Sequence, residues 1–241
     1  MVKLGIIGAM EVEVKTLRSS MKEAKITEKA GMVFCEGFLE GVPAVVARCG
    51  VGKVQAALCA QILCVCFGVS HIVNTGIAGA LGESLEIGDL VVSLDAMYHD
   101  FDCGPVGYPL GQVPGMPLTF AADETLIGYA FAAGEKVFPG HVKTGRIASG
   151  DQFVSGQEMK KKIVETTKGL CTEMEGTAIA QAAYINKVPF VILRVISDKA
   201  DDSAQVDYPV FEAEAAKRCA AVTTALAAHI HAVLEEQGSI S

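Results

Sequence analysis

Short hydrophobic runs alternate along the chain with longer stretches of helical periodicity. The runs, each bounded by Gly or polar residues, predict strands at residues 4–7, 44–46, 71–73, 90–94, 144–148 and 190–196. Several lack strict hydrophobic–polar alternation, as expected of strands buried on both faces. Helical patterns lie between them, at residues 13–21, 53–67, 123–136, 156–166, 177–186 and 210–236. This alternation predicts an α/β fold with a mixed, mostly parallel sheet under helical layers.

The length and the hydrophobic runs limit the domain organisation. The 241 residues contain no linker, repeat or low-complexity stretch, which predicts one domain over residues 1–241. The longest nearly unbroken apolar stretch, residues 56–69, contains Gln61 and is shorter than the ~20 residues that cross a bilayer. It therefore predicts a buried helix. The N-terminus lacks the apolar run of a secretory signal, so we expect a cytoplasmic protein with reduced, mostly buried cysteines.

Charge and residue spacing narrow the range of ligands. A net charge of −8 argues against nucleic acid and anionic membranes as partners, because both attract basic surfaces. The histidines and cysteines show no spacing typical of metal ligands. We therefore expect a small neutral or cationic ligand, with no metal and no cofactor.

One long segment carries neither a helical nor a strand pattern. Residues 98–117 are rich in Gly and Pro, which predicts a loop. A loop of this length in a compact domain often serves as a lid or as a subunit contact.

Three acidic residues follow predicted strands closely. Glu13 comes after the strand that begins at residue 4, Glu175 after an apolar segment at 171–174, and Asp198 after the strand at 190–196. Ligands of open α/β sheets bind at the carboxyl ends of strands, so these carboxylates are candidate active-site groups. Helix capping is the alternative role for Glu175, and capping or turn formation is the alternative for Asp198.

Two further segments follow predicted strands with chemistry suited to a ligand. Residues 74–80 contain glycines that let backbone amides approach a ligand, although a simple turn explains them equally well. Phe153 follows the strand at 144–148 and could stack on a planar base, or it could be an ordinary core aromatic. Residues 49–53 (CGVGK) contain neither of the common phosphate-loop patterns.

Five motifs, taken together and in order, resemble the bacterial 5′-methylthioadenosine/S-adenosylhomocysteine nucleosidases. They are residues 5–13 (GIIGAMEVE), 74–79 (NTGIAG), 149–153 (SGDQF), 173–178 (EMEGTA) and 194–198 (RVISD). The match runs over nearly the whole chain. It implies the fold of the nucleoside phosphorylase superfamily, with a partly barrel-like sheet flanked by helices, and a homodimer.

The resemblance also implies a reaction. The bond between adenine N9 and ribose C1′ of methylthioadenosine, adenosylhomocysteine and 5′-deoxyadenosine would be hydrolysed, releasing adenine and, from the first two, a 5′-thio-substituted ribose. Asp198 would be the general acid that protonates adenine N7, with Ser197 holding it in place. Glu13 would accept a proton from the attacking water, and Glu175 would bind the ribose hydroxyls.

Other residues are implicated by the same resemblance. Phe153 would stack on adenine, the Val154 backbone would hydrogen-bond the base edge, and Arg194 would lie near the water. The full set implicated in substrate binding is Met10, Ile77, Ala78, Gly79, Phe153, Val154, Glu173, Met174, Arg194, Ser197 and Tyr208. Residues expected from a lid or a partner subunit are Val106, Tyr108 and Pro114.

Two positions depart from the family pattern. Ile77 stands where some relatives place a small hydroxyl residue, so the water network is expected to differ. Val106 stands where relatives can carry a larger aromatic residue over the 5′ substituent, which leaves the preference for that group open.

Rival functions differ in the charge that they require. Phosphorolysis needs a site for a phosphate dianion, and Glu13 would repel one. AMP would need cations for its phosphate, but residues 99–117 contain no Lys or Arg. A futalosine-type nucleosidase and a catalytically silent nucleoside-binding module remain as alternatives.

Overall fold

The strands form one mixed sheet in the computed structural model, which describes residues 2–238. Within this range the order is β10-β6-β8-β9-β5-β1-β4-β3-β2, and β7 pairs with β6. The strands are β1 (Leu4–Gly8), β2 (Lys22–Lys29), β3 (Met32–Leu39), β4 (Val42–Arg48), β5 (His71–Ala80), β6 (Leu90–Tyr98), β7 (Phe120–Ala121), β8 (Val142–Ser149), β9 (Cys171–Glu173) and β10 (Phe190–Asp198).

Part of this sheet closes on itself. Strand β10 pairs with β5 as well as with β6, so β10, β6, β8, β9 and β5 form a ring. The remaining strands extend from β5 as an open sheet. The predicted mixed, partly barrel-like sheet is therefore confirmed.

The ring joins two groups of parallel strands that run in opposite directions. Strands β4, β1, β5 and β10 are parallel to one another, and so are β6, β8 and β9. The groups meet in the antiparallel pairs β10–β6 and β5–β9, and in the second the end of β5 lies opposite the start of β9, with Gly79 opposite Thr172. Because β9 has only three residues, its carboxyl end still lies close to that of β5. Residues that follow strands in either group can therefore share one site.

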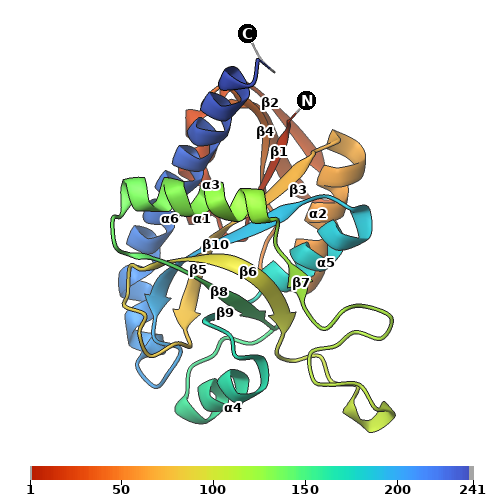
Figure 1. Cartoon of the computed structure of the whole chain (residues 1–241), viewed down its shortest axis with the longest axis vertical. Coiled ribbons are helices and arrows are strands. Elements are labelled where there is room, and N and C mark those ends of the chain that lie inside the picture. Colours follow the sequence, from red (N-terminus) through yellow and green to blue (C-terminus); the bar gives the residue numbers. More distant parts are fainter. Residues whose placement is uncertain (1, 239–241) are drawn as a thin grey trace.

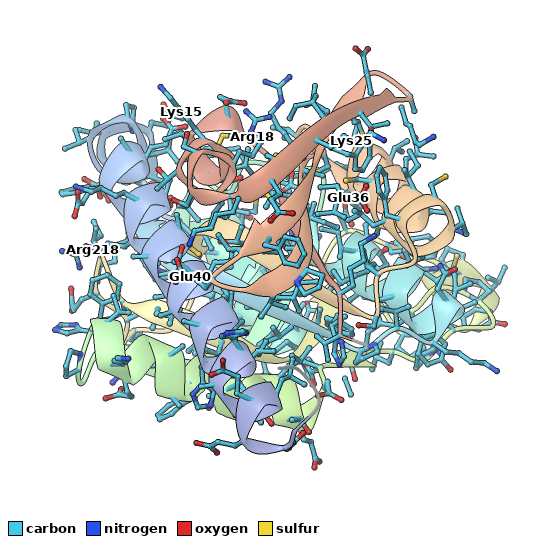
Figure 2. The ribbon with its side chains drawn as sticks, turned by 90° about the horizontal axis from the view of Figure 1, so that it is seen from above. Lys15, Arg18, Lys25, Glu36, Glu40 and Arg218 are labelled. Carbon is cyan, nitrogen blue, oxygen red and sulfur yellow. The ribbon has the colours of Figure 1, made fainter. Side chains whose placement is uncertain are left out.

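Helices cover the sheet on both faces. They are α1 (Glu11–Ser20), α2 (Lys53–Phe67), α3 (Glu124–Val137), α4 (Gln157–Thr167), α5 (Gly176–Asn186) and α6 (Ala204–Glu236), with a short 3₁₀ turn η1 (Gly104–Val106). Helices α2 and α5 pack together, with α6 on the opposite side (Figure 1). Helix α6 packs against both α1 and α3, and Lys15 and Lys25 point outward from α1 and β2 (Figure 2).

Strand β10 shows why a continuous hydrophobic run marks a central strand. Its side chains alternate between two cores: Leu193 and Val195 pack in the cluster that includes α1, α3 and α6, and Ile192 packs in the cluster that includes α2 and α5. All nine of its residues are buried. Besides Ser197 and Asp198 at its end, the exception to its apolar character is Arg194, a charged residue in the middle of a buried strand.

Several boundaries differ from the sequence-based expectation. Residues 74–80, expected as a loop after a strand, continue β5 as far as Ala80. Helix α1 begins at Glu11, so Glu13 lies in its first turn, and α6 begins at Ala204. The hairpin strands β2 and β3 were not predicted, because β2 is an exposed, charged strand without a hydrophobic face.

Three further expectations concern membrane-spanning helices, the cysteines and the long loop. No helix within residues 2–238 is long and apolar enough to cross a membrane. Five of the eight cysteines are buried, whereas Cys66 is exposed and Cys64 and Cys103 are partly so. The residues between β6 and β7 extend away from the body of the molecule, as expected of a loop (Figure 1).

Candidate active site

A cavity lies where the carboxyl ends of the two strand groups meet. Its walls contain the three carboxylates selected from the sequence, Glu13, Glu175 and Asp198, all of which are buried. The lining residues are Ala9, Met10, Glu13, Val51, Ile77, Ala78, Gly79, Gln152, Phe153, Val154, Thr172, Glu173, Met174, Glu175, Ser197, Asp198 and Tyr208.

The Glu13 carboxylate is held by backbone amides. One oxygen, Oε2, accepts hydrogen bonds from the amides of Ala9 at 2.7 Å and Met10 at 2.9 Å, and Oε1 accepts one from Ile77 at 3.2 Å. Glu13 is the third residue of α1, and the bond that it accepts from the Met10 amide is part of a capping box at the start of this helix. Burial raises the pKa of Glu13, against the opposing effects of Arg194 and these amides.

Gly76 leaves room for this carboxylate. A Cβ atom at Gly76 would lie 2.6 Å from Glu13 Oε1 and 3.0 Å from Arg194 Nη1. Any larger residue would therefore displace Glu13 or Arg194. The glycines of the 74–79 motif thus make space for a charged side chain within a strand.

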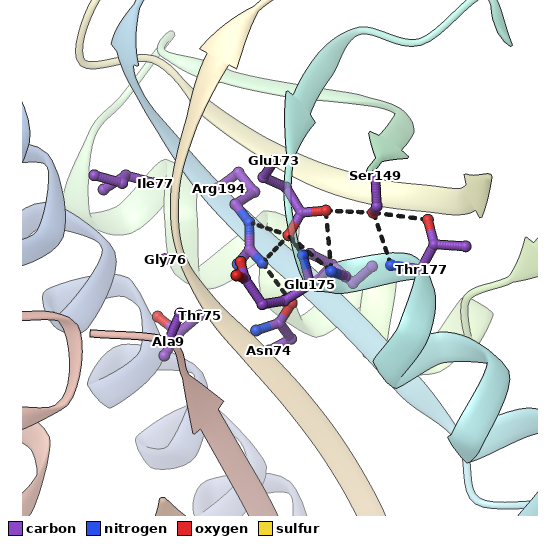
Figure 3. A network of polar contacts seen from close by, with 12 residues as sticks. Ala9, Asn74, Thr75, Gly76, Ile77, Ser149, Glu173, Glu175, Thr177 and Arg194 are labelled. Atoms are coloured by element: carbon purple, nitrogen blue, oxygen red, sulfur yellow. Dashed lines mark hydrogen bonds and ion pairs between the residues drawn. The ribbon is translucent and has the colours of Figure 1, made fainter. Parts of the chain in front are cut away.

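Behind the cavity, Arg194 and Glu173 form a buried ion pair (Figure 3). Arg194 also donates to Asn74 Oδ1 at 2.5 Å and to its neighbouring carbonyl at Leu193. Although burial opposes its charge, Glu173 and Glu13 raise the pKa of Arg194. The guanidinium therefore stays charged inside the molecule.

Glu173 is saturated by its neighbours. Besides Arg194, its carboxylate accepts hydrogen bonds from the Ser149 hydroxyl and from the backbone amides of Glu175 and Gly176. Ser149 in turn accepts from the amide and the hydroxyl of Thr177 (Figure 3). Glu173 therefore caps the start of α5, and both of its oxygens accept hydrogen bonds from neighbouring residues.

Glu175 occupies the N-cap position of α5, but its side chain makes no capping hydrogen bond. Instead its Oε1 accepts a hydrogen bond from the Gly52 amide at 2.7 Å, and the side chain lines the cavity. Burial, followed by the charge of Glu173, raises the pKa of Glu175 to about 8. The capping alternative for this side chain is therefore wrong, because Glu173 performs that role.

Asp198 is the last residue of β10. Its Oδ2 accepts from the Ser197 hydroxyl at 2.8 Å, and its Oδ1 accepts from the Ala200 amide at 2.8 Å. The second bond shapes the turn after the strand, so the turn-forming role is also real. Burial raises the pKa of Asp198, against the effect of these two hydrogen bonds.

Most of the residues implicated by the resemblance line the cavity, but four do not. Arg194 lies behind the wall, engaged with Glu173 and Asn74. Val106, Tyr108 and Pro114 lie in the extended loop, and none of them contributes to the cavity of a single chain. The aromatic ring of Phe153 is not a core residue, since it lines the cavity and is 47 % exposed.

Some residues that form the cavity were not predicted from the sequence. Val51, Gln152 and Thr172 line the cavity, and the Gly52 amide holds Glu175. The 49–53 segment was noticed only as a failed phosphate loop, although its glycines signal close backbone approach. Within residues 2–238, no group of three or more His, Cys, Asp or Glu side chains is placed to hold a metal ion.

Known proteins are similar to this chain over most of its length. The family model of the phosphorylase superfamily covers residues 3–228. A 5′-methylthioadenosine/S-adenosylhomocysteine nucleosidase from Staphylococcus carnosus is 40 % identical over 216 residues, which cover 89 % of this chain and 94 % of that protein. The chain belongs to this nucleosidase family.

Solved structures support the assignment. The nucleosidase from Neisseria meningitidis, in complex with methylthio-immucillin-A, has a TM-score of 0.92 and 36 % identity, covering 95 % of this chain and 99 % of that one. A futalosine hydrolase from Helicobacter pylori is also similar, with a TM-score of 0.89, 32 % identity, and coverage of 93 % and 97 %. The nucleosidase fold thus hosts more than one nucleoside substrate.

The raised pKa of Glu175 predicts a measurable pH dependence of stability. The pKa of Glu175 is near 8 in the folded protein and 4.5 is its ordinary value. Between pH 4.5 and 8 the folded protein therefore binds more protons than the unfolded chain, and the free energy of unfolding falls as the pH rises. We expect Glu175→Gln to make this decline shallower. Urea unfolding at about pH 5, 7 and 9 measures it, with Glu28→Gln on exposed β2 as the control. Equal slopes for Glu175→Gln and the parent would contradict the assignment.

Proposed function

We propose that the chain hydrolyses the N-glycosidic bond of 5′-methylthioadenosine and S-adenosylhomocysteine, releasing adenine and a 5′-thio-substituted ribose. It is a hydrolase of N-glycosyl compounds. The observation that carries this proposal is one cavity lined by the carboxyls of Asp198, Glu13 and Glu175, and we assign adenine to the Asp198 end and the ribose to Glu13 and Glu175. Relatives of the same family carry this activity in their names.

Asp198 supplies the proton for the leaving group. Burial favours its neutral form at higher pH than usual for an aspartate, because it raises the pKa, so the carboxyl can carry a proton to adenine N7. When the bond between C1′ and N9 breaks, its electron pair goes to adenine, which leaves as a neutral base. The bonds from Ser197 and Ala200 fix the orientation of the acid.

The sugar end stabilises positive charge. Loss of adenine leaves an oxocarbenium-like ribose, and the Glu13 carboxylate, which must be ionised to act as the base, places negative charge where this cation develops. Glu175 is positioned to bind the ribose hydroxyls. A water attacks C1′ and passes a proton to Glu13, whose three amide hydrogen bonds hold the carboxylate in place.

The same charges favour water over phosphate as the nucleophile. Of the described residues that line the cavity, none is Lys, Arg or His. Arg194, the cation behind the wall, is already paired with Glu173. A phosphate dianion would therefore meet the carboxylates without a compensating cation.

A futalosine-type nucleosidase is the second candidate, favoured by the similarity to the Helicobacter pylori hydrolase. That reaction would use the same acid and the same carboxylates. A catalytically silent binder is the third candidate, and the three carboxylates at the site argue against it.

Release of adenine from methylthioadenosine tests the proposal. We expect chromatography to detect free adenine at the same rate with and without inorganic phosphate. Release that requires phosphate would identify a phosphorylase and would overturn the role of Glu13. No release from methylthioadenosine, with release of base from futalosine, would establish the second candidate, and calorimetric binding without any turnover would establish a silent binder.

Substitution of the acid should uncouple catalysis from folding. We expect Asp198→Asn to lower kcat about 10²–10⁴-fold, because a positioned general acid contributes this much, and Glu13→Gln to lower it by orders of magnitude as well. Asp202→Asn, which removes an exposed carboxylate nearby, is the control. Kinetics together with circular dichroism measure both effects, and near-parent rates in either active-site variant would refute that residue's role.

We further propose that the protein is a cytoplasmic homodimer. Helices α2 and α5 expose an apolar surface that includes Val54, Leu58 and Ile185, with Val54 72 % exposed. An apolar surface of this kind on a soluble protein marks an interaction site. It borders a groove lined also by Phe101 and Val113 of the extended loop, so a second copy docked there would contact that loop.

The dimer is tested by mass. We expect sedimentation to give twice the 25.2 kDa mass of the chain, and Leu58→Asp to shift the protein toward the monomer because it places a charge in the apolar surface. Ile26→Asp, at an exposed position of β2, should leave the mass unchanged. A monomeric parent, or dissociation by Ile26→Asp alone, would contradict this interface.

A further inference from the structure

The cavity has a mouth that faces the 5′ substituent. This step rests on the proposed function: with adenine at Asp198 and ribose at Glu13 and Glu175, the 5′ group points toward the remaining wall. That wall consists of Met10, Val51, Phe153 and Tyr208. Val51 is 50 % exposed and Phe153 is 47 % exposed, so this wall is the open side of the cavity.

Tyr208 is fixed at this mouth by three neighbours. Its ring meets Phe153 edge-on, with centroids 5.4 Å apart and planes at 87°. Its hydroxyl lies 3.4 Å from Met10 Sδ and donates a hydrogen bond to Glu212 Oε1 at 3.2 Å. Positions 208 and 212 are four apart on α6 and therefore share one face of the helix. Tyr208 thus ties the Glu212 carboxylate to the mouth.

The surroundings of this pair are acidic. Residues 201–216 contain five Asp or Glu residues and no Lys, Arg or His. The cavity lining likewise includes carboxylates but, among the described residues, no basic side chain. Burial and then the charge of Glu212 raise the pKa of Tyr208, which keeps the phenol protonated as a hydrogen-bond donor.

We propose that Tyr208 and Glu212 select the 5′ substituent by its charge. A neutral thioether is accepted. An ammonium group is favoured, because it can approach the Glu212 carboxylate. A substituent whose only charge is a carboxylate is disfavoured, because the mouth offers it no cation. The homocysteine group of adenosylhomocysteine satisfies this rule by turning its ammonium toward Glu212 and its carboxylate toward water. A futalosine-type substituent does not, because its aromatic 5′ group carries a carboxylate and no ammonium.

A matched pair of ligands tests this rule. The probes are 5′-(2-aminoethylthio)-5′-deoxyadenosine and 5′-(2-carboxyethylthio)-5′-deoxyadenosine, which are similar in length and opposite in charge. Calorimetry in the Asp198→Asn background gives both Kd values without turnover. We expect the amine to bind more tightly than the carboxylate. Glu212→Gln should reduce the ratio of the carboxylate Kd to the amine Kd about five- to tenfold, which is the effect of one charge across a partly screened contact of several ångströms.

Two further variants distinguish the effect of the position of the Glu212 charge from the effect of the net charge of the protein. Glu214→Gln removes the same charge from an exposed position of α6 and should leave the ratio unchanged. Tyr208→Phe keeps the charge but releases Glu212, and should also reduce the ratio.

The outcomes of this experiment are distinct from those of the activity test. Equal effects of Glu212→Gln and Glu214→Gln, or no effect of Glu212→Gln, would overturn the rule. A carboxylate probe that binds as tightly as the amine would do the same. Failure of the parent protein to release adenine would instead refute the proposed function, because binding selectivity is measured separately from turnover.

Discussion

The active site depends on one buried ion pair, that of Arg194 and Glu173. Arg194 lies on the central strand β10, and Glu173 ends β9 and caps α5. The pair joins these elements, and the contact from Arg194 to Asn74 adds β5. Removing one partner of such a pair typically costs about 3–5 kcal/mol, because the other charge is left buried and uncompensated. The pair therefore fixes the geometry of the elements that carry the carboxylates.

The same pair distributes charge in the site. Glu173 is paired with the buried guanidinium and accepts further hydrogen bonds from Ser149 and Gly176. Glu175 receives much less: one amide hydrogen bond from Gly52, beside the repelling charge of Glu173. Two glutamates separated by one residue thus have different environments: Glu173 is bonded within the structure, whereas Glu175 lines the cavity with one hydrogen bond. Environments that separate neighbouring carboxyls in this way are typical of sites that perform acid–base chemistry.

The sequence allowed the fold and much of the site to be predicted, for identifiable reasons. Buried strands such as β10 are continuous apolar runs, and the carboxyl ends of parallel strands collect functional groups, so Glu13, Glu175 and Asp198 could be found. The extension of β5 through residues 74–80 was missed because its glycines, which suit a turn, serve instead to make room for Glu13. The part played by Gly52 was missed because the 49–53 segment was compared only with phosphate loops, whereas its glycine amide holds a carboxylate.

The position of Arg194 could not have been derived from its own strand. A charge inside an apolar run predicts either a ligand-binding group or a buried pair, and only the place of β9 in the ring shows that the partner is Glu173. The family resemblance implies a place for Arg194 near the water, which stays a prediction; in the structure Arg194 is paired with Glu173 and is not among the residues that line the cavity. Burial and pairing, which depend on residues distant in the sequence, decide between these roles.

The division between scaffold and surface explains how one fold can serve several nucleosides. The groups that we assign to adenine and ribose lie on strand ends and the first turns of helices, where packing holds them rigidly. The residues that we assign to the 5′ group include Tyr208, near the start of α6. Surface segments tolerate substitution more readily than a packed sheet does. Chemistry at the glycosidic bond can therefore stay constant while the charge and shape of the mouth change, so a likeness in fold to both nucleosidases and a futalosine hydrolase is expected.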